Sequence, residues 1–99
     1  MALQIVWTIN ALEDYRRVVD YLLIEWTLKV ASDFITTLEE RVDTLRSFPN
    51  IGIASLKYPL IRSIVITKHN KLYYRIHTDK IEILSIFDTR QNPAKNIYE

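Results

Sequence analysis

The sequence contains no cysteine and a single glycine, Gly52, among its 99 residues. Without cysteine the chain cannot form a disulfide framework, a thiolate zinc site or a cysteine nucleophile. One glycine cannot build a glycine-rich phosphate loop, and no G-x-S-x-G motif occurs, so P-loop nucleotide chemistry and α/β-hydrolase chemistry are excluded. The two histidines, His69 and His77, do not fall in a metal-ligand spacing such as H-E-x-x-H. We therefore expect no metal, no cofactor and no small-molecule ligand.

Long hydrophobic runs are also missing. No apolar run approaches the roughly 18 residues that indicate a membrane-spanning helix, and the sequence does not open with a basic segment followed by an apolar stretch. These absences predict a cytoplasmic protein without membrane contact. The length of the chain predicts a single domain over residues 1–99, too small for a second lobe or a deep substrate tunnel.

The net charge of +1 is the sum of two halves of opposite sign. Residues 1–49 carry five basic and eight acidic side chains, a balance of −3, whereas residues 50–99 carry eight basic and four acidic ones, a balance of +4. Such an asymmetry indicates a polyanionic partner or an acidic protein segment as partner. An ordinary solvated surface is the alternative interpretation, and charge alone does not decide between the two.

The first half of the sequence predicts a strand followed by two helices. Residues 3–8 are rich in β-branched and aromatic side chains, which is typical of a short strand. Two apolar stripes with spacings of three and four then predict amphipathic helices, with Thr8 and Thr27 as N-caps and Asn10 and Glu13 in capping-box spacing. The short connection predicts an antiparallel helical hairpin that ends at residues 48–52. The first stripe comprises Ala11, Tyr15, Val18, Val19, Leu22, Leu23 and Trp26, and the second comprises Ala31, Phe34, Ile35, Leu38, Val42 and Leu45.

The second half is strand-like. Residues 61–67, 71–77 and 81–88 are β-rich runs separated by short polar links, and links of that length predict consecutive antiparallel hairpins. The predicted fold class is α+β, with an N-terminal strand, an antiparallel helical hairpin and then a three-stranded antiparallel meander. The helices should pack on one face of the resulting four-stranded sheet. On the middle strand, the opposite face should be polar and carry Lys71, Tyr73, Arg75 and His77.

Cationic and aromatic side chains gather in the strand-like half. Arginine and lysine bind phosphates, aromatic rings stack on unpaired bases, and a cation beside a proton-transferring side chain can promote RNA cleavage. The same residue types also make up ordinary outward sheet faces, so both interpretations stay open. The set comprises Arg62, Lys68, His69, Lys71, Tyr73, Tyr74, Arg75, His77, Arg90 and Tyr98.

Several short motifs, taken together, resemble a known protein family. They are Trp7-Thr8 with Ala11 and Asp14, then Tyr21, then Phe34-Ile35, and above all residues 62–93, which include the runs at 73–76 and 83–93. In this order they resemble the RelE/ParE toxin superfamily of bacterial type II toxin–antitoxin modules, over nearly the whole chain. The resemblance implies the fold predicted above and a cytoplasmic toxin that causes growth inhibition, serves plasmid stabilisation and is silenced by a cognate antitoxin.

The superfamily divides into ParE-like toxins that poison DNA gyrase and RelE-like, ribosome-dependent mRNA endonucleases. By resemblance to the endonucleases, catalytic roles would fall to Arg62, Lys71, Arg90 and Tyr98. The second lysine of the endonuclease pattern falls at Ile64, which can neither transfer a proton nor bind phosphate. The chain is therefore closer to the ParE branch, with an mRNA endonuclease and an inactive toxin-fold protein as alternatives.

The resemblance and the charge split also predict partners. An acidic antitoxin segment should contact Arg62, Arg75 and Arg90, and an apolar antitoxin helix could lie against Leu12 or Ile24. The expected target is DNA gyrase in the ParE case, and the ribosome with its mRNA in the RelE case.

Overall fold

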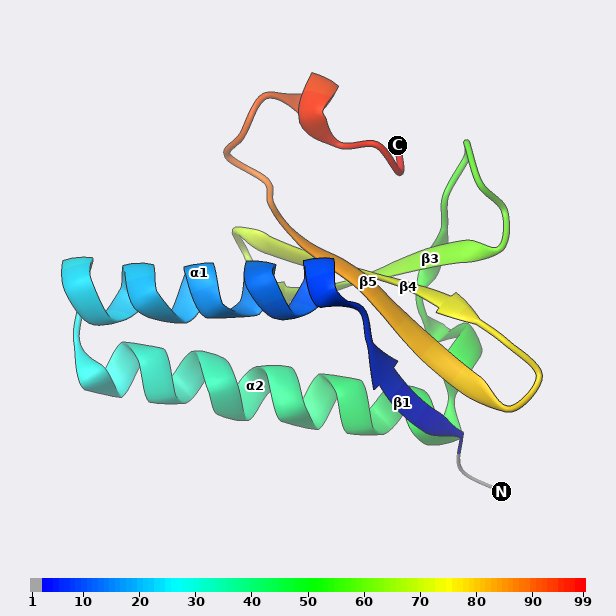
Figure 1. Ribbon diagram of the computed structural model, residues 1–99, viewed down its shortest axis with the longest axis horizontal. Coiled ribbons are helices and arrows are strands. Elements are labelled where there is room, and N and C mark those ends of the chain that lie inside the picture. The colour runs from blue at the N-terminus through cyan, green and yellow to red at the C-terminus, as the bar shows by residue number, and fades with distance from the viewer. Residues whose placement is uncertain (1–2) are drawn as a thin grey trace.

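The computed structural model describes residues 3–99, which fold into two antiparallel helices on one face of a twisted sheet (Figure 1). Residues 1–2 of the predicted domain lie outside the described residues. The sheet order is β1-β5-β4-β3-β2, with β1 parallel to β5 and the other pairs antiparallel. The elements are β1 (Gln4–Trp7), α1 (Ile9–Glu25), α2 (Leu28–Ser47), η1 (Pro49–Ile51), β2 (Ile53–Ala54), β3 (Ile61–Thr67), β4 (Asn70–Ile76), β5 (Lys80–Asp88) and η2 (Pro93–Lys95).

The α+β fold class is confirmed, but the sheet has five strands instead of the predicted four. The additional strand, β2, consists of Ile53 and Ala54, which pair with Ser63 and Arg62 of β3. Two residues are too few for an alternating pattern, and the Ile53 side chain is 77% exposed. Nothing in the local sequence therefore separates β2 from a loop.

Both helices begin where the capping residues predict. The Thr8 hydroxyl accepts a hydrogen bond from the Ala11 amide, and the Thr27 hydroxyl accepts one from the Val30 amide, each at 3.1 Å. Each hydroxyl satisfies one of the amides that the first turn leaves without a partner. Asn10 does not act in a capping box, because its side-chain amide donates to a strand carbonyl described below.

The core lies between the helical hairpin and the near face of the sheet, which we call the inner face. The inner face contributes Leu72 and Tyr74 from β4 and Ile81, Ile83 and Ile86 from β5. The second predicted stripe faces them, since four of its members are buried in the same cluster. Burial of one large apolar side chain contributes about 1.5–3 kcal/mol, so these contacts fix the hairpin on the sheet. Those four members are Phe34, Leu38, Val42 and Leu45.

Gly52, which follows η1, is required by close packing and not by its backbone angles. Its φ of −71° and ψ of 160° are accessible to any residue. A Cβ at this position would collide with the Tyr74 hydroxyl and lie 2.9 Å from the carbonyl oxygen of Ser63. The amide of Gly52 donates to the Tyr74 hydroxyl at 3.0 Å, and that hydroxyl donates to the carbonyl of Pro49 at 2.6 Å. Tyr74 thus joins β4 to the segment that follows α2.

Candidate functional site

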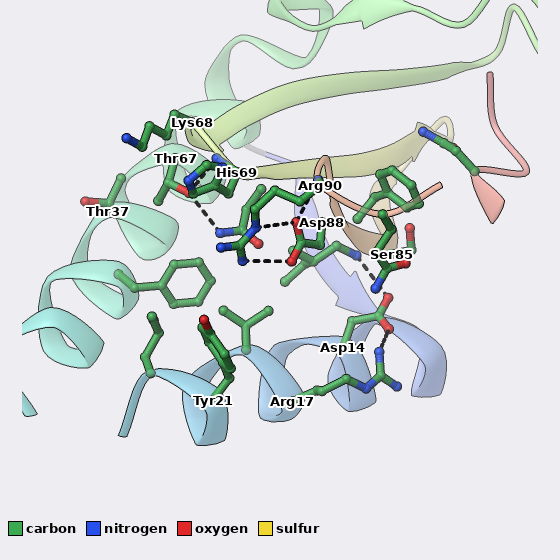
Figure 2. Close-up of a pocket in the computed structure, with 18 of the residues that line it drawn as sticks. Asp14, Arg17, Tyr21, Thr37, Thr67, Lys68, His69, Ser85, Asp88 and Arg90 are labelled. Carbon is green, nitrogen blue, oxygen red and sulfur yellow. Dashed lines mark hydrogen bonds and ion pairs between the residues drawn. The ribbon is translucent and has the colours of Figure 1, made fainter. Parts of the chain in front are cut away.

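A groove with a volume of about 830 Å³ runs beside the second half of β5 (Figure 2). Its walls come from α1, the start of α2, the β3–β4 turn, the end of β5 and the segment that follows β5. β1 pairs with β5 only as far as Ile83, so no strand lies beside this part of β5 on the β1 side. The groove therefore follows a free sheet edge, which proteins commonly use or protect.

Side chains from the start of α1 make hydrogen bonds to this free edge. The Thr8 hydroxyl and the Asn10 amide donate to the carbonyl of Leu84, at 3.2 and 3.3 Å. Leu84 has no partner in β4, because the β4–β5 register skips it, which is the signature of a β-bulge. Four residues after Asn10, one helical turn along, Asp14 accepts the amide of Ile86 at 3.1 Å. α1 thus takes the place of a neighbouring strand.

Asp14 lines the groove but was not among the site residues expected from the sequence. Its carboxylate is buried and binds two donors, the Ile86 amide and the Arg17 guanidinium, which lies 3.0 Å away. Among the sequence-based expectations Asp14 served only in the family resemblance. One signal was present: it lies three residues after Ala11 and four before Val18, so an acid falls within the apolar stripe.

The groove combines an apolar floor with a rim of four cations. Three carboxylates, Asp14, Asp33 and Asp88, also line it, and Asp14 and Asp88 pair with Arg17 and Arg90. The spacing of α1 residues by three and four places several of these side chains on one side of the helix. Figure 2 shows Tyr21 projecting from α1 toward Arg90, and Arg17 lying along the helix with its guanidinium against Asp14. Among the described residues, neither Lys68 nor Lys95 has an ion-pair partner. The floor includes Val18, Leu22, Phe34 and Ile86, and the rim includes Arg17, Lys68, Arg90 and Lys95.

Arg90 is held in a defined position at the rim. Its Nε and one Nη donate to the two carboxylate oxygens of Asp88, at 3.0 and 2.9 Å, and its amide donates to the same carboxylate. These bonds hold the pKa of the Asp88 carboxyl below its usual range. The guanidinium also lies 5.8 Å from the centre of the Tyr21 ring, within the range of a cation–π contact.

The β3–β4 turn presents the remaining rim side chains, Lys68 and His69. Thr67 accepts the His69 amide at 3.3 Å and the Asn70 side-chain amide at 2.8 Å. Thr89 donates its amide to the His69 carbonyl at 2.9 Å, which ties the turn to the segment after β5. The turn is thus fixed relative to Arg90 while the Lys68 side chain remains exposed.

The structure does not bring the four residues of the predicted endonuclease set together. Arg62 shares the inner face with Tyr74, its partner in β4, and donates to the carbonyl of Gly52 at 2.8 Å. Lys71 and Tyr98 lie on the opposite, outer face of the sheet, and Tyr98 also lines the groove. Arg90 lies in the groove, which Thr67 at the end of β3 also lines. Thr67 is five residues, or about 16 Å, along the strand from Arg62.

The three predicted antitoxin contacts are also separated. Arg90 lies in the groove, and Arg62 points toward η1, where it also reaches the carbonyl of Asn50 at 3.4 Å. Arg75 is exposed and shares a rung of the outer face with Ile61 and Glu82. Among these three arginines, only Arg90 lines the groove.

The outer face is less open than the sequence suggests. The alternation of β4 is as predicted, but Tyr73 is fully buried, although both α1 and α2 pack on the other side of the sheet. Residues 96–99 cover it, as described below, and burial raises the pKa of the Tyr73 hydroxyl to about 12. The sequence-based expectation placed residues 89–99 on the surface, which holds for most of them but omits this cover.

A second, smaller concave surface of about 380 Å³ lies between β1 and the two helices. Ile5, Trp7 and Tyr15 line it together with Leu12, which the sequence nominated for antitoxin binding and which is 45% exposed. Ile24, the other nominated residue, is exposed near the tip of the helical hairpin. The two therefore belong to different surfaces.

The same fold occurs in solved structures of bacterial toxins. A chain of the chromosomal ParDE system from P. aeruginosa has 20% sequence identity and a TM-score of 0.73, over 88% of this chain and 96% of that one. The YoeB dimer from Staphylococcus aureus has 16% sequence identity and a TM-score of 0.64, over 88% of this chain and 97% of that one. The YoeB/ParE toxin from Agrobacterium tumefaciens has 14% sequence identity and a TM-score of 0.63, over 87% of this chain and 98% of that one. These similarities define the class of protein by its fold, which is that of the RelE/ParE toxins.

The family follows from the sequence itself. No curated protein sequence matches the chain significantly, but residues 5–93 match the family described as the ParE toxin of the type II toxin–antitoxin system parDE. The protein therefore belongs to the ParE toxin family of type II toxin–antitoxin systems. Within residues 3–99, no helix has both the length and the apolar character needed to cross a membrane. The same residues hold no group of three or more acidic or histidine side chains placed to bind a metal ion.

Proposed function

We propose that this protein is a ParE-like toxin of the cytoplasm that inhibits an essential target, with DNA gyrase as the first candidate, and that a cognate antitoxin neutralises it. The observation that carries the proposal is the groove beside β5, together with membership of the ParE family. An apolar floor with cations on its rim is the surface that an amphipathic helix with acidic residues recognises.

Arg90 is the rim residue best placed to meet an acidic partner. Asp88 accepts hydrogen bonds from Nε and one Nη of its guanidinium, and the Tyr21 ring lies beside the same group. The guanidinium is thus positioned in advance, and its remaining N–H groups are not bonded to Asp88. A positioned cation loses less conformational freedom on binding than a flexible one. Lys68 and Lys95 extend the same charge along the rim.

The endonuclease alternative has weaker support. Cleavage of RNA needs a base, an acid and cations around one phosphate. Arg62, Lys71, Arg90 and Tyr98 are distributed over the two faces and the far end of the sheet, and Ile64 supplies no proton-transferring group.

The target is tested with purified toxin in two parallel assays. In the first, the toxin is added to DNA gyrase and relaxed plasmid, and we expect loss of supercoiling or accumulation of cleaved DNA. In the second, it is added to translating ribosomes, and we expect intact mRNA. Ribosome-dependent mRNA cuts that disappear with Arg62→Ala or Arg90→Ala would establish the endonuclease instead. A chain that neither arrests growth nor acts in either assay would be the inactive toxin-fold protein.

Neutralisation is tested with any small protein that is encoded immediately beside this gene as candidate antitoxin. We expect a stable complex, and we expect Arg90→Glu to weaken it about tenfold or more at low salt, since like charges at an interface are strongly unfavourable. Arg41→Glu is the matched control, because Arg41 is exposed on α2 and does not line the groove. Equal affinities for both variants would remove the groove from the interface.

A further inference from the structure

Residues 96–99, here called the strap, lie over the outer face of the sheet. In Figure 1 the chain turns back after β5 and returns above the sheet, on the side away from α2. The Tyr98 ring stacks on the Tyr73 ring, with centroids 5.0 Å apart and planes at 27°. The Asn96 amide donates to the Tyr73 hydroxyl at 2.8 Å, and that hydroxyl donates to the Glu99 carboxylate at 2.9 Å. Lys71 lies 3.4 Å from the same carboxylate.

The sheet contributes a prepared surface beneath the strap. Tyr73 forms one rung with Ser63 and Ser85, and all three side chains are buried although they lie on the face opposite the core. At the edge of this surface the Ser55 hydroxyl donates to the main-chain carbonyl of Tyr98. The surface thus offers a flat ring, a phenol donor, a cation and a donor for a main-chain carbonyl.

The strap itself is weakly anchored. Residues 89–95, which precede it, are exposed and form only the single turn η2. Its ion pair is partly solvated, because the side chain of Lys71 is 31% exposed and that of Glu99 is 40% exposed. Ion pairs exposed to solvent contribute little to stability. A short segment joined to the fold by an exposed linker opens far more readily than a core strand.

We propose that the strap is a releasable cover over a peptide-binding site on the outer face, and that a partner segment with an aromatic residue followed by an acidic one replaces it. The Ser55 hydroxyl meets a main-chain carbonyl and the Tyr73 ring meets an aromatic side chain of the same segment, so this surface already holds a stretch of peptide, and a peptide of the same chemistry is the ligand that it fits. Arg75 is exposed two residues along β4 on the same face, and it extends the site toward a second acidic side chain.

The cover also links this site to the groove. Asn96, Ile97 and Tyr98 line the groove as well as forming most of the strap. Release of the strap therefore removes part of one groove wall, so a ligand on the outer face changes the affinity of a ligand in the groove. By linkage, the effect is reciprocal. The site does not depend on which target or antitoxin the toxin has.

The test uses a fluorescein-labelled peptide with the sequence of residues 92–99 as the probe, and full-length protein. The variant Tyr98→Ala/Glu99→Gln weakens the protein's own strap, and fluorescence anisotropy should show at least about tenfold tighter probe binding than to the wild type, because the intramolecular competitor is lost. Adding Tyr73→Phe, which removes the phenol that bonds to Asn96 and Glu99, should weaken probe binding again. The matched control is Ile97→Ala, because Ile97 is an exposed strap residue that takes no part in the contacts to Tyr73, and this variant should bind the probe like the wild type.

Equal probe affinity for the wild type and the strap-weakened variant, with circular dichroism showing both folded, would overturn the proposal. So would affinity unchanged by Tyr73→Phe, or tighter binding of a single-stranded oligonucleotide than of the peptide. If the variant does not fold, the rate of amide hydrogen exchange in the wild-type strap tests the proposal instead. The Tyr98 amide, which donates to Asn96, should exchange faster when excess unlabelled peptide is added, and an unchanged rate would refute release of the strap.

Discussion

The contact between Gly52 and Tyr74 permits a quantitative prediction for Gly52→Ala. The added Cβ would collide with the Tyr74 hydroxyl and meet the Ser63 carbonyl oxygen at 2.9 Å. Overpacking of a buried site costs about 1–3 kcal/mol, and displacement of the hydroxyl from the Gly52 amide loses a hydrogen bond of about 1 kcal/mol. Alanine also restricts the unfolded chain, which returns about 0.4–1 kcal/mol. We expect a net loss of about 1–3 kcal/mol in the free energy of unfolding.

A double-mutant cycle with Tyr74→Phe isolates the contact. Removal of the hydroxyl alone leaves the Gly52 amide and the Pro49 carbonyl without their partner, at a cost of about 1–3 kcal/mol. In that background Gly52→Ala should cost less, by about 1 kcal/mol or more, because the nearest clash is gone. Urea unfolding followed by circular dichroism gives all four free energies. Additive costs, or a Gly52→Ala variant as stable as the wild type, would refute the close-packing explanation.

Three further predictions concern the groove and the helices. Asp14→Asn should lower the free energy of unfolding by about 1–3 kcal/mol, since the amide cannot serve both donors as the carboxylate does; the exposed Asp20→Asn should be neutral, and equal urea midpoints would contradict the role of Asp14. Asp88 has a lowered pKa in the folded state, so its contribution to the free energy of unfolding is present above the unfolded pKa and is lost as pH falls through the folded pKa. Asp88→Asn should therefore reduce the loss of stability on acidification, measured by urea unfolding at several pH values. An unchanged pH dependence would be inconsistent with the Arg90 contact. Thr27→Ala should cost about 1 kcal/mol through loss of the cap, measured by thermal unfolding, whereas the mid-helix Thr36→Ala should not destabilise.

The sequence predicted the elements that repeat a local signal. β3 was predicted with its observed bounds, and Thr8 and Thr27 begin the helices, because alternation, apolar stripes and capping hydroxyls are read within a few residues. What local patterns could not provide is the pairing between distant segments. β2 is a strand only because β3 lies beside it, and the burial of Tyr73 depends on residues more than twenty positions away.

The candidate site was predicted in part. Arg62 and Arg90 were both nominated from the family pattern, but only Arg90 lies in the groove. Arg75 was grouped with them on charge, which cannot tell the inner face from the outer. Asp14 was missed as a site residue because its partner is a main-chain amide 72 positions away. Whether any of these residues contacts a partner stays a prediction.

The pairing of the first strand with the last has a consequence for the timing of folding. β1 meets β5 only after residues 80–83 are available, and Asp14 finds its partner only when Ile86 is in place. Contacts between segments so far apart in the chain are slow to form, because a long loop must close first. A ribosome that synthesises about 5–20 residues per second therefore releases most of the chain before the groove can exist. Any nascent or truncated chain that stops before β5 lacks the groove, so no ligand of the groove can bind until β5 has been synthesised.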